Sequence, residues 1–300
     1  MYSSINERNY SQVMADNEAQ RQSPSHHGTK GLNYASSQRK SDNDRPLLTL
    51  IHCSDVHLAP DRQACLNNFA LVADYVNAFK PDVMVITGDL VDGRKGLVRS
   101  EFQLFKDYIN KVNTPVLYVP GNHDIGNKPG LGNSLSIERL SAYKEMLGSD
   151  RWYYEMNSVH LLGLNNVLLN SNFSEEREQR EWLVRVLQDI PMEEKTLLFA
   201  HYPLFLENPE EALSDTHYWT VGLPAGEEQL YFLSQFKVTA YLCGHCHKAI
   251  SREYAGTKFI AAPAVSFSLT NEAESVGINI VRIYPDELSV KTIRLVDLKS

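Results

Sequence analysis

Residues 47–57 read Leu-Leu-Thr-Leu-Ile-His-Cys-Ser-Asp-Val-His, an apolar run that ends in two potential metal ligands. A short run of mostly aliphatic residues predicts a buried strand, here over 47–53. Asp55 and His57 follow directly after that strand. Because ligands of open α/β sheets bind beyond the carboxyl ends of the strands, this stretch predicts both a strand and a site.

Strands and helices alternate along the chain that follows. Further apolar runs predict strands at 82–87, 115–119, 196–200 and 239–242. Helical periodicity predicts helices at 63–79, 100–112, 137–147, 175–190 and 225–236. Short runs at 250–254, 258–262, 277–284 and 288–295 are typical of antiparallel strands. We therefore expect an α/β (α+β) domain of two sheets flanked by helices, with parallel βα units in its first half.

Composition restricts the function classes. The chain has 300 residues, of which 43% are hydrophobic and 22% charged, and its net charge is −8. A negative net charge disfavours stable binding to nucleic acid or to an anionic membrane, and no apolar run is long enough to cross a bilayer. Four cysteines are too few for a disulfide scaffold of this size, so we expect a cytoplasmic protein.

The first 45 residues differ from the rest. Leu, Ile, Val and Phe occur there only as Ile5, Val13 and Leu32. Such a segment buries too little apolar area to offset its ordering entropy. We expect residues 1–45 to be a disordered tail and residues 46–300 to be one folded domain.

Five predicted strand ends carry Asp, Asn or His. They are Asp55-x-His57, Gly88-Asp89, Gly121-Asn122-His123-Asp124, His201 and Gly244-His245-x-His247. Carboxylate, amide oxygen and imidazole together suit Mn²⁺, Fe²⁺ or Zn²⁺. Residues at i and i+2 of an extended segment share a face, and glycine permits a sharp turn towards a metal. Each motif alone is common in solvated loops and turns, but five in one order, each at a strand end, indicate a metal site.

A competing pattern lies inside the last motif. Cys243-x-x-Cys246-His247 matches the attachment signature of c-type haem, and Cys-x-x-Cys also occurs in zinc knuckles. No export signal precedes it, and Cys53 and Cys65 have the wrong spacing for a knuckle. We expect these cysteines to be small, semi-buried neighbours of a metal ligand.

The ordered motifs resemble those of the calcineurin-like metallophosphoesterase superfamily over residues 47–295. The resemblance implies a four-layer fold, in which two mixed β-sheets pack as a sandwich flanked by helices. It also implies two divalent metal ions, Mn²⁺, Fe²⁺ or Zn²⁺. The implied ligands are Asp55, His57 and His247 for one metal, Asn122, His201 and His245 for the other, and Asp89 as the bridge.

The same resemblance implies the reaction and two further roles. Phosphoesters are hydrolysed by in-line attack of a hydroxide that bridges the metals. His123 faces the substrate phosphate together with Asn122, and Asp124 orients His123. Because all these residue types are present, we expect an enzyme rather than a binding module on the same fold.

The substrate branch has two candidates. The motifs agree most literally with class III cyclic-nucleotide phosphodiesterases, which predicts a small-molecule diester. Residues 201–207, followed by Tyr218-Trp219, resemble the small cytosolic phosphatases that act on phosphoproteins. That second branch tends to have Gln where His57 stands, and we therefore place phosphodiesterase ahead of phosphomonoesterase. Asp92 stands where purple acid phosphatases have a tyrosine ligand, which excludes that branch.

Overall fold

The computed structural model describes residues 45–94, 96, 98–128, 134–210, 218–269 and 275–299. The expected tail lies outside the described residues except for Arg45, so its disorder stays a prediction. Among the helices that are described, none combines the length and the apolar character needed to cross a membrane.

The first sheet has the strand order β11-β10-β1-β2-β3. Its strands are β1 (Leu48–Cys53), β2 (Val83–Thr87), β3 (Val116–Val119), β10 (Gly277–Ile283) and β11 (Leu288–Arg294). β1, β2 and β3 are parallel, whereas β10 is antiparallel to both β1 and β11. The carboxyl ends of the three parallel strands therefore lie at one edge of this sheet.

The second sheet has the strand order β4-β5-β6-β7-β9-β8. Its strands are β4 (Trp152–Met156), β5 (Val159–Gly163), β6 (Lys195–Phe199), β7 (Ala240–Cys243), β8 (Ile250–Tyr254) and β9 (Thr257–Ala261). The inner strands are parallel, and β4 and β8 pair antiparallel at the two edges. Both sheets are mixed, which confirms the expected architecture.

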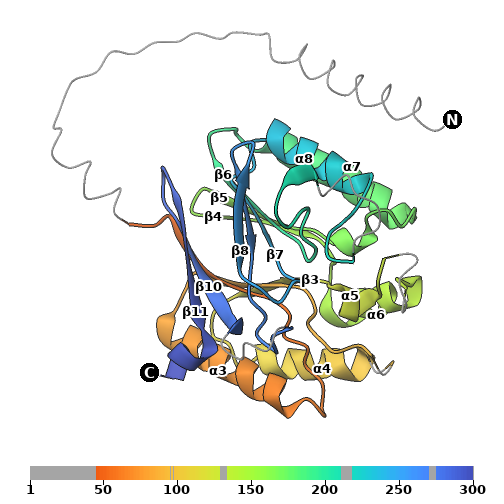
Figure 1. The fold of residues 1–300 in the computed structure, drawn as a ribbon, viewed down its shortest axis with the longest axis vertical. Helices are drawn as coiled ribbons and strands as arrows, with labels where there is room; N and C mark the ends of the chain where they lie inside the picture. Colours follow the sequence, from red (N-terminus) through yellow and green to blue (C-terminus); the bar gives the residue numbers. More distant parts are fainter. Residues whose placement is uncertain are drawn as a thin grey trace, which may run out of the picture. The chain divides into compact units, whose positions relative to one another are not determined.

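The two sheets pack face to face through one buried apolar cluster. It includes Leu50 and Val85 of the first sheet and Leu161, Phe199 and Leu242 of the second. Helices cover the outer faces, as Figure 1 shows. They are α3 (Gln63–Phe79) and α4 (Val98–Ile109) on the first sheet, and α7 (Ser174–Asp189) and α8 (Ala225–Gln235) on the second. The result is a four-layer sandwich, in which a second cluster of buried apolar residues packs the helices against the sheets.

Two local elements differ from the sequence-based expectation. The hairpin of β4 and β5 was not predicted, because the central residues of β4 are exposed and give no alternating pattern. The motif that begins at Gly121, for which no helix was predicted, is a one-turn helix, α5 (Asn122–Ile125). The remaining short elements are α6 (Ile137–Leu147), η1 (Asn166–Leu168) and η4 (Leu295–Lys299). The expected bounds of α3 and α6 are confirmed.

The contribution of helix packing to stability can be tested at α4. Phe102 is fully buried and meets the ring of Tyr143 on α6 edge-on, with centroids 5.8 Å apart. Phe102→Ala leaves a cavity and should lower the free energy of unfolding by about 3–5 kcal/mol. Gln103→Ala, on the exposed face of the same helix, should change it by less than about 0.5 kcal/mol. Urea denaturation of both variants measures the difference, and equal effects would contradict the packing described.

Candidate metal centre

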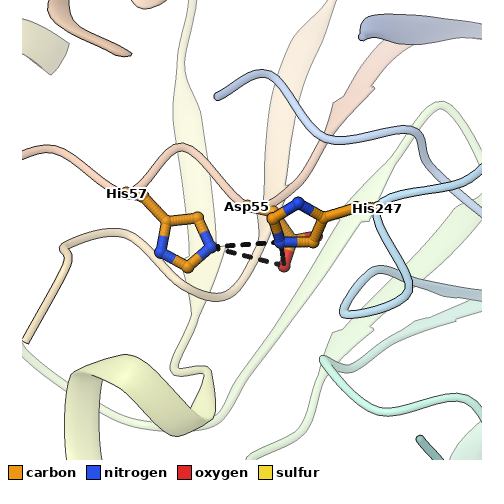
Figure 2. Close-up of side chains that lie close together, drawn as sticks. All are labelled: Asp55, His57 and His247. Atoms are coloured by element: carbon orange, nitrogen blue, oxygen red, sulfur yellow. Dashed lines mark hydrogen bonds and ion pairs between the residues drawn. The ribbon is translucent and has the colours of Figure 1, made fainter. Parts of the chain in front are cut away.

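Three donor side chains from distant parts of the chain meet beyond the end of β1. Nε2 of His57 lies 3.2 Å from Nε2 of His247 and 4.0 Å from Oδ1 of Asp55. Nε2 of His247 lies 3.4 Å from the same carboxylate oxygen. Figure 2 shows the three groups pointing towards one another. All three are buried, so these atoms face each other rather than solvent.

A second group forms beyond the ends of β2, β6 and β7. Asp89, His201 and His245 offer ligand atoms that lie within 4.8 Å of one another. Nε2 of His201 also lies 2.9 Å from Oδ1 of Asn122, the first residue of α5. The four side chains are buried. The structure therefore brings together all seven side chains that the sequence predicts as ligands.

Asp89 lies between the two groups. One of its oxygens, Oδ2, is 3.6 Å from Nε2 of His57, and the other, Oδ1, is 3.4 Å from Nε2 of His201. Each carboxylate oxygen therefore faces a different group. This is the arrangement needed for a residue that bridges two cations.

Backbone carbonyl groups fix the tautomers of three histidines. The hydrogen bonds are from His201 Nδ1 to the Thr87 carbonyl (2.8 Å), from His247 Nδ1 to that of Phe267 (2.8 Å) and from His245 Nε2 to that of Tyr218 (3.0 Å). Because a carbonyl oxygen can only accept, each of these nitrogens carries the proton. When such a ring is neutral, its other nitrogen presents a lone pair, which is how ligating histidines are oriented.

The donor chemistry fits a bound cation. Oδ1 of Asp55 is buried and has no hydrogen-bond partner among the described residues. It faces the lone pair of His247 Nε2 and lies beside Nε2 of His57. Such converging negative charge and lone pairs are unfavourable without a positive partner. A dication at this place would satisfy them.

The pKa values of the ligand histidines shift in two directions: those of His57 and His245 fall, and those of His201 and His247 rise. Burial lowers the pKa of His57 and of His245 to about 3, which keeps both rings neutral, as ligation requires. Burial also opposes charge on His201, but the charge of Asp89 and its hydrogen bond outweigh burial and raise the pKa to about 9. The carboxylates therefore attract positive charge, whether it is carried by a proton or by a metal ion.

The ligand backbone corrects one step of the sequence reasoning. Asp55 and His57 have φ of 54° and 45°, and His245 and His247 have φ of 68° and 51°. These values are left-handed, so neither pair lies on an extended segment as the i, i+2 argument assumed. Asp89 has φ of 51° as well. Non-glycine residues adopt this conformation rarely, and it is concentrated at functional sites.

The role expected for Asp124 also needs correction. Its carboxylate accepts hydrogen bonds from the backbone N–H groups of Gly121 (2.7 Å), Val91 (3.1 Å) and Leu90 (3.2 Å). It therefore ties the loop after β2 to the start of α5 and does not bond the His123 ring. That ring is held by the backbone carbonyl of Asp92, to which Nδ1 donates at 2.6 Å. Backbone carbonyls leave no sequence signal, so neither this contact nor those of the ligands could be predicted.

The two cysteines of the competing pattern are not part of the donor groups found among the described residues. Cys243 is buried in the core, and burial raises the pKa of Cys246 to about 12. Both therefore remain thiols, which are poor ligands.

Gly244 holds the two ligand loops at close approach, which allows a test. A Cβ at this position would overlap Oγ of Ser54 and lie 2.7 Å from Oδ2 of Asp55. Gly244→Ala should displace Asp55 and lower the metal bound per chain. Cys246→Ala removes atoms from the same turn and should keep the metal of the parent. Elemental analysis after dialysis measures both variants, and full metal retention by Gly244→Ala would contradict either the displacement of Asp55 or its role as a ligand.

Comparison with known proteins places the chain in a family. The family model "Calcineurin-like phosphoesterase" matches residues 48–249. The chain is 27% identical over 225 residues to the 3′,5′-cyclic adenosine monophosphate phosphodiesterase CpdA of Escherichia coli, covering 72% of this chain and 75% of the relative. It is 27% identical over 211 residues to the serine/threonine-protein phosphatase CPPED1 of Danio rerio, covering 67% of this chain and 65% of the relative.

Solved structures agree on the fold. A dimetal phosphatase from Danio rerio superimposes with a TM-score of 0.60 at 16% identity, covering 84% of this chain and 98% of that one. The family model spans most of the chain, including all seven converging side chains and His123. The chain belongs to the calcineurin-like phosphoesterase family, a family of metallophosphoesterases.

Proposed function

We propose that this protein is a two-metal hydrolase of phosphoesters that prefers diesters of the cyclic-nucleotide type. The observation that carries the two-metal part is the position of Asp89, whose two oxygens face different donor groups. Asp55, His57 and His247 would hold one ion, and Asn122, His201 and His245 the other, with Asp89 shared. This mixture of carboxylate, amide and imidazole suits Mn²⁺, Fe²⁺ or Zn²⁺. When bound, the pair supplies positive charge to the phosphoryl oxygens and lowers the pKa of water.

His123 is placed to give a proton to the departing oxygen. Its backbone N–H donates to Oδ1 of Asp89 at 2.8 Å, which fixes it beside the bridge. Its ring meets the His57 ring edge-on, with centroids 4.5 Å apart. Because Nδ1 donates to the Asp92 carbonyl, Nε2 is the nitrogen left to serve the substrate. His123 is thus next to the metal ligands without being needed as one.

Two observations support a diester substrate. His57 completes a full first donor group, as in the phosphodiesterase branch that the sequence resembles most literally. The CpdA proteins of Haemophilus influenzae and Escherichia coli, both named as cyclic AMP phosphodiesterases, are similar over 80% and 72% of this chain. A phosphomonoesterase acting on phosphoproteins is the second candidate, because CPPED1 phosphatases are similar at a comparable identity.

A substrate panel separates the two candidates. The metal-reconstituted protein is assayed with bis(4-nitrophenyl) phosphate and cyclic AMP as diesters, and with 4-nitrophenyl phosphate and a phosphopeptide as monoesters. We expect a higher kcat/KM for the diesters. Faster turnover of both monoesters would instead assign the protein to the phosphatase branch.

The role of His123 has its own test. His123→Ala should keep both metal equivalents but lose a factor of about 10²–10⁴ in turnover of a diester with a poor leaving group, because no group then protonates the departing oxygen. The loss should shrink for nitrophenolate, which leaves readily without a proton. An equal loss for both leaving groups would indicate substrate positioning, and loss of metal would make His123 a ligand.

A further inference from the structure

A pair of arginines lies on one carboxylate beside His123. Oδ1 of Asp92 is 3.0 Å from Nη2 of Arg62 and 3.3 Å from Nε of Arg94. The carboxylate is only 5% exposed, whereas the two arginine side chains are 31% and 53% exposed. The carboxylate of Asp92 is therefore buried, and the side chains of Arg62 and Arg94 are partly exposed to solvent.

This group is adjacent to the catalytic histidine. Asp92 supplies the carbonyl that holds Nδ1 of His123, and ligand atoms of His57, Asp92 and His123 lie within 4.8 Å of one another. The cluster could be taken for a third metal site. Arg62 and Arg94 form ion pairs with this carboxylate, although its Oδ1 accepts no hydrogen bond from a described residue. Their positive charge offsets that of Asp92 without a metal ion.

Arg62 is fixed relative to the first donor group. Its guanidinium lies 5.6 Å from the centroid of the Phe267 ring. The same ring is 4.7 Å from that of His247 and 5.2 Å from that of His57. The Phe267 carbonyl accepts the hydrogen bond that orients His247. Arg62 is therefore held between Asp92 and Phe267 at a set distance from the ligands.

Guanidinium groups outnumber the carboxylate that they pair with. Two of them lie on Asp92 in a protein whose net charge is −8, and Glu101 is close enough to interact with Asp92 and Asp61. Two guanidinium groups carry ten N–H donors, far more than one carboxylate can accept. Donors in this number, held in place and partly exposed, suit an anionic oxygen group.

We propose that Arg62, assisted by Arg94, binds an anionic group, a carboxylate or a phosphate, on the part of the substrate that departs beside His123. Arg62 is then a specificity-determining residue for the leaving group and not for the scissile phosphoryl group. The inference rests on the proposed function, because it takes the side of the site at His123 as the leaving-group side.

The test uses three aryl leaving groups that differ in charge. Phenyl phosphate is the neutral reference, 4-carboxyphenyl phosphate adds a carboxylate, and 1,4-phenylene bisphosphate adds a phosphate. Each is assayed as the monoester and as the methyl diester of the reacting phosphate. We expect the charged leaving groups to have a kcat/KM about tenfold higher than the reference. In Arg62→Gln, the ratio of kcat/KM between the charged leaving groups and the neutral reference should fall to near one. The change should lie in KM rather than in kcat.

Two control variants distinguish charge from structure. Arg62→Lys keeps the cation and should keep part of the preference. Arg99→Gln removes an arginine that pairs with Glu145 on the surface of α4 and should leave the ratio unchanged. Metal content and the thermal midpoint of each variant identify misfolding. The preference should also weaken at high ionic strength.

The outcomes separate this inference from the proposed function. The faster series, monoester or diester, tests the proposed substrate type. Within either series, the ratio of kcat/KM for a charged leaving group to that for the neutral reference tests the role of Arg62 alone. A parent protein without preference for the charged groups, or a preference that survives in Arg62→Gln, would overturn the inference. A preference for only one of the two anions would identify which group the site accepts.

Discussion

Buried negative charge is the constraint on which the site depends. Asp55 and Asp89 have almost no solvent exposure, and although burial opposes their charge, the nearby imidazoles keep the pKa values of both carboxyl groups low. Burying a carboxylate is costly unless it is paired. Nδ1 of His201 and of His247 donates to a backbone carbonyl, which turns Nε2 of each ring towards these carboxylates, where it can carry a proton or bind a metal ion. The charge, the tautomers and the geometry are all consistent with cations beyond the carboxyl ends of the strands.

The two sheets of the sandwich make this arrangement possible because the carboxyl ends of their parallel strands lie at the same edge of the domain. Loops from the first sheet carry Asp55 and Asp89, and loops from the second carry His201 and His245. Apolar residues of these loops, such as Val56, Leu58 and Leu90, are buried in the cluster that packs the helices onto the sheets and hold the loops in place. This packing also supports backbone conformations that isolated loops would avoid, with left-handed φ at five of the ligands. Packing elsewhere in the domain thus stabilises the left-handed backbone conformation of these ligands.

The sequence predicted the donor set but not how the protein holds it. Asp, Asn and His at strand ends are visible as motifs, and their convergence follows from strand direction. The left-handed backbone at Asp55 and His57 is not visible, because Asp and His adopt it more often than most residues but still at only a minority of positions. Asp124 bonds backbone amides instead of His123, since sequence adjacency does not specify which way a carboxylate points. The β4–β5 hairpin escaped prediction because an exposed edge strand has no hydrophobic alternation.

Family membership and substrate choice depend on different residues. In the proposed reaction the seven donor side chains and His123 serve the phosphoryl group, which every phosphoester shares. Apart from His57, they can therefore be common to relatives named as phosphodiesterases and as phosphatases. Discrimination must come from groups that touch the rest of the substrate. Arg62 lies just before α3, outside the five motifs, yet reaches Asp92 and Phe267 beside the donors. A residue of this kind can vary while the metal ligands stay the same, so the leaving group can change without altering the chemistry at phosphorus.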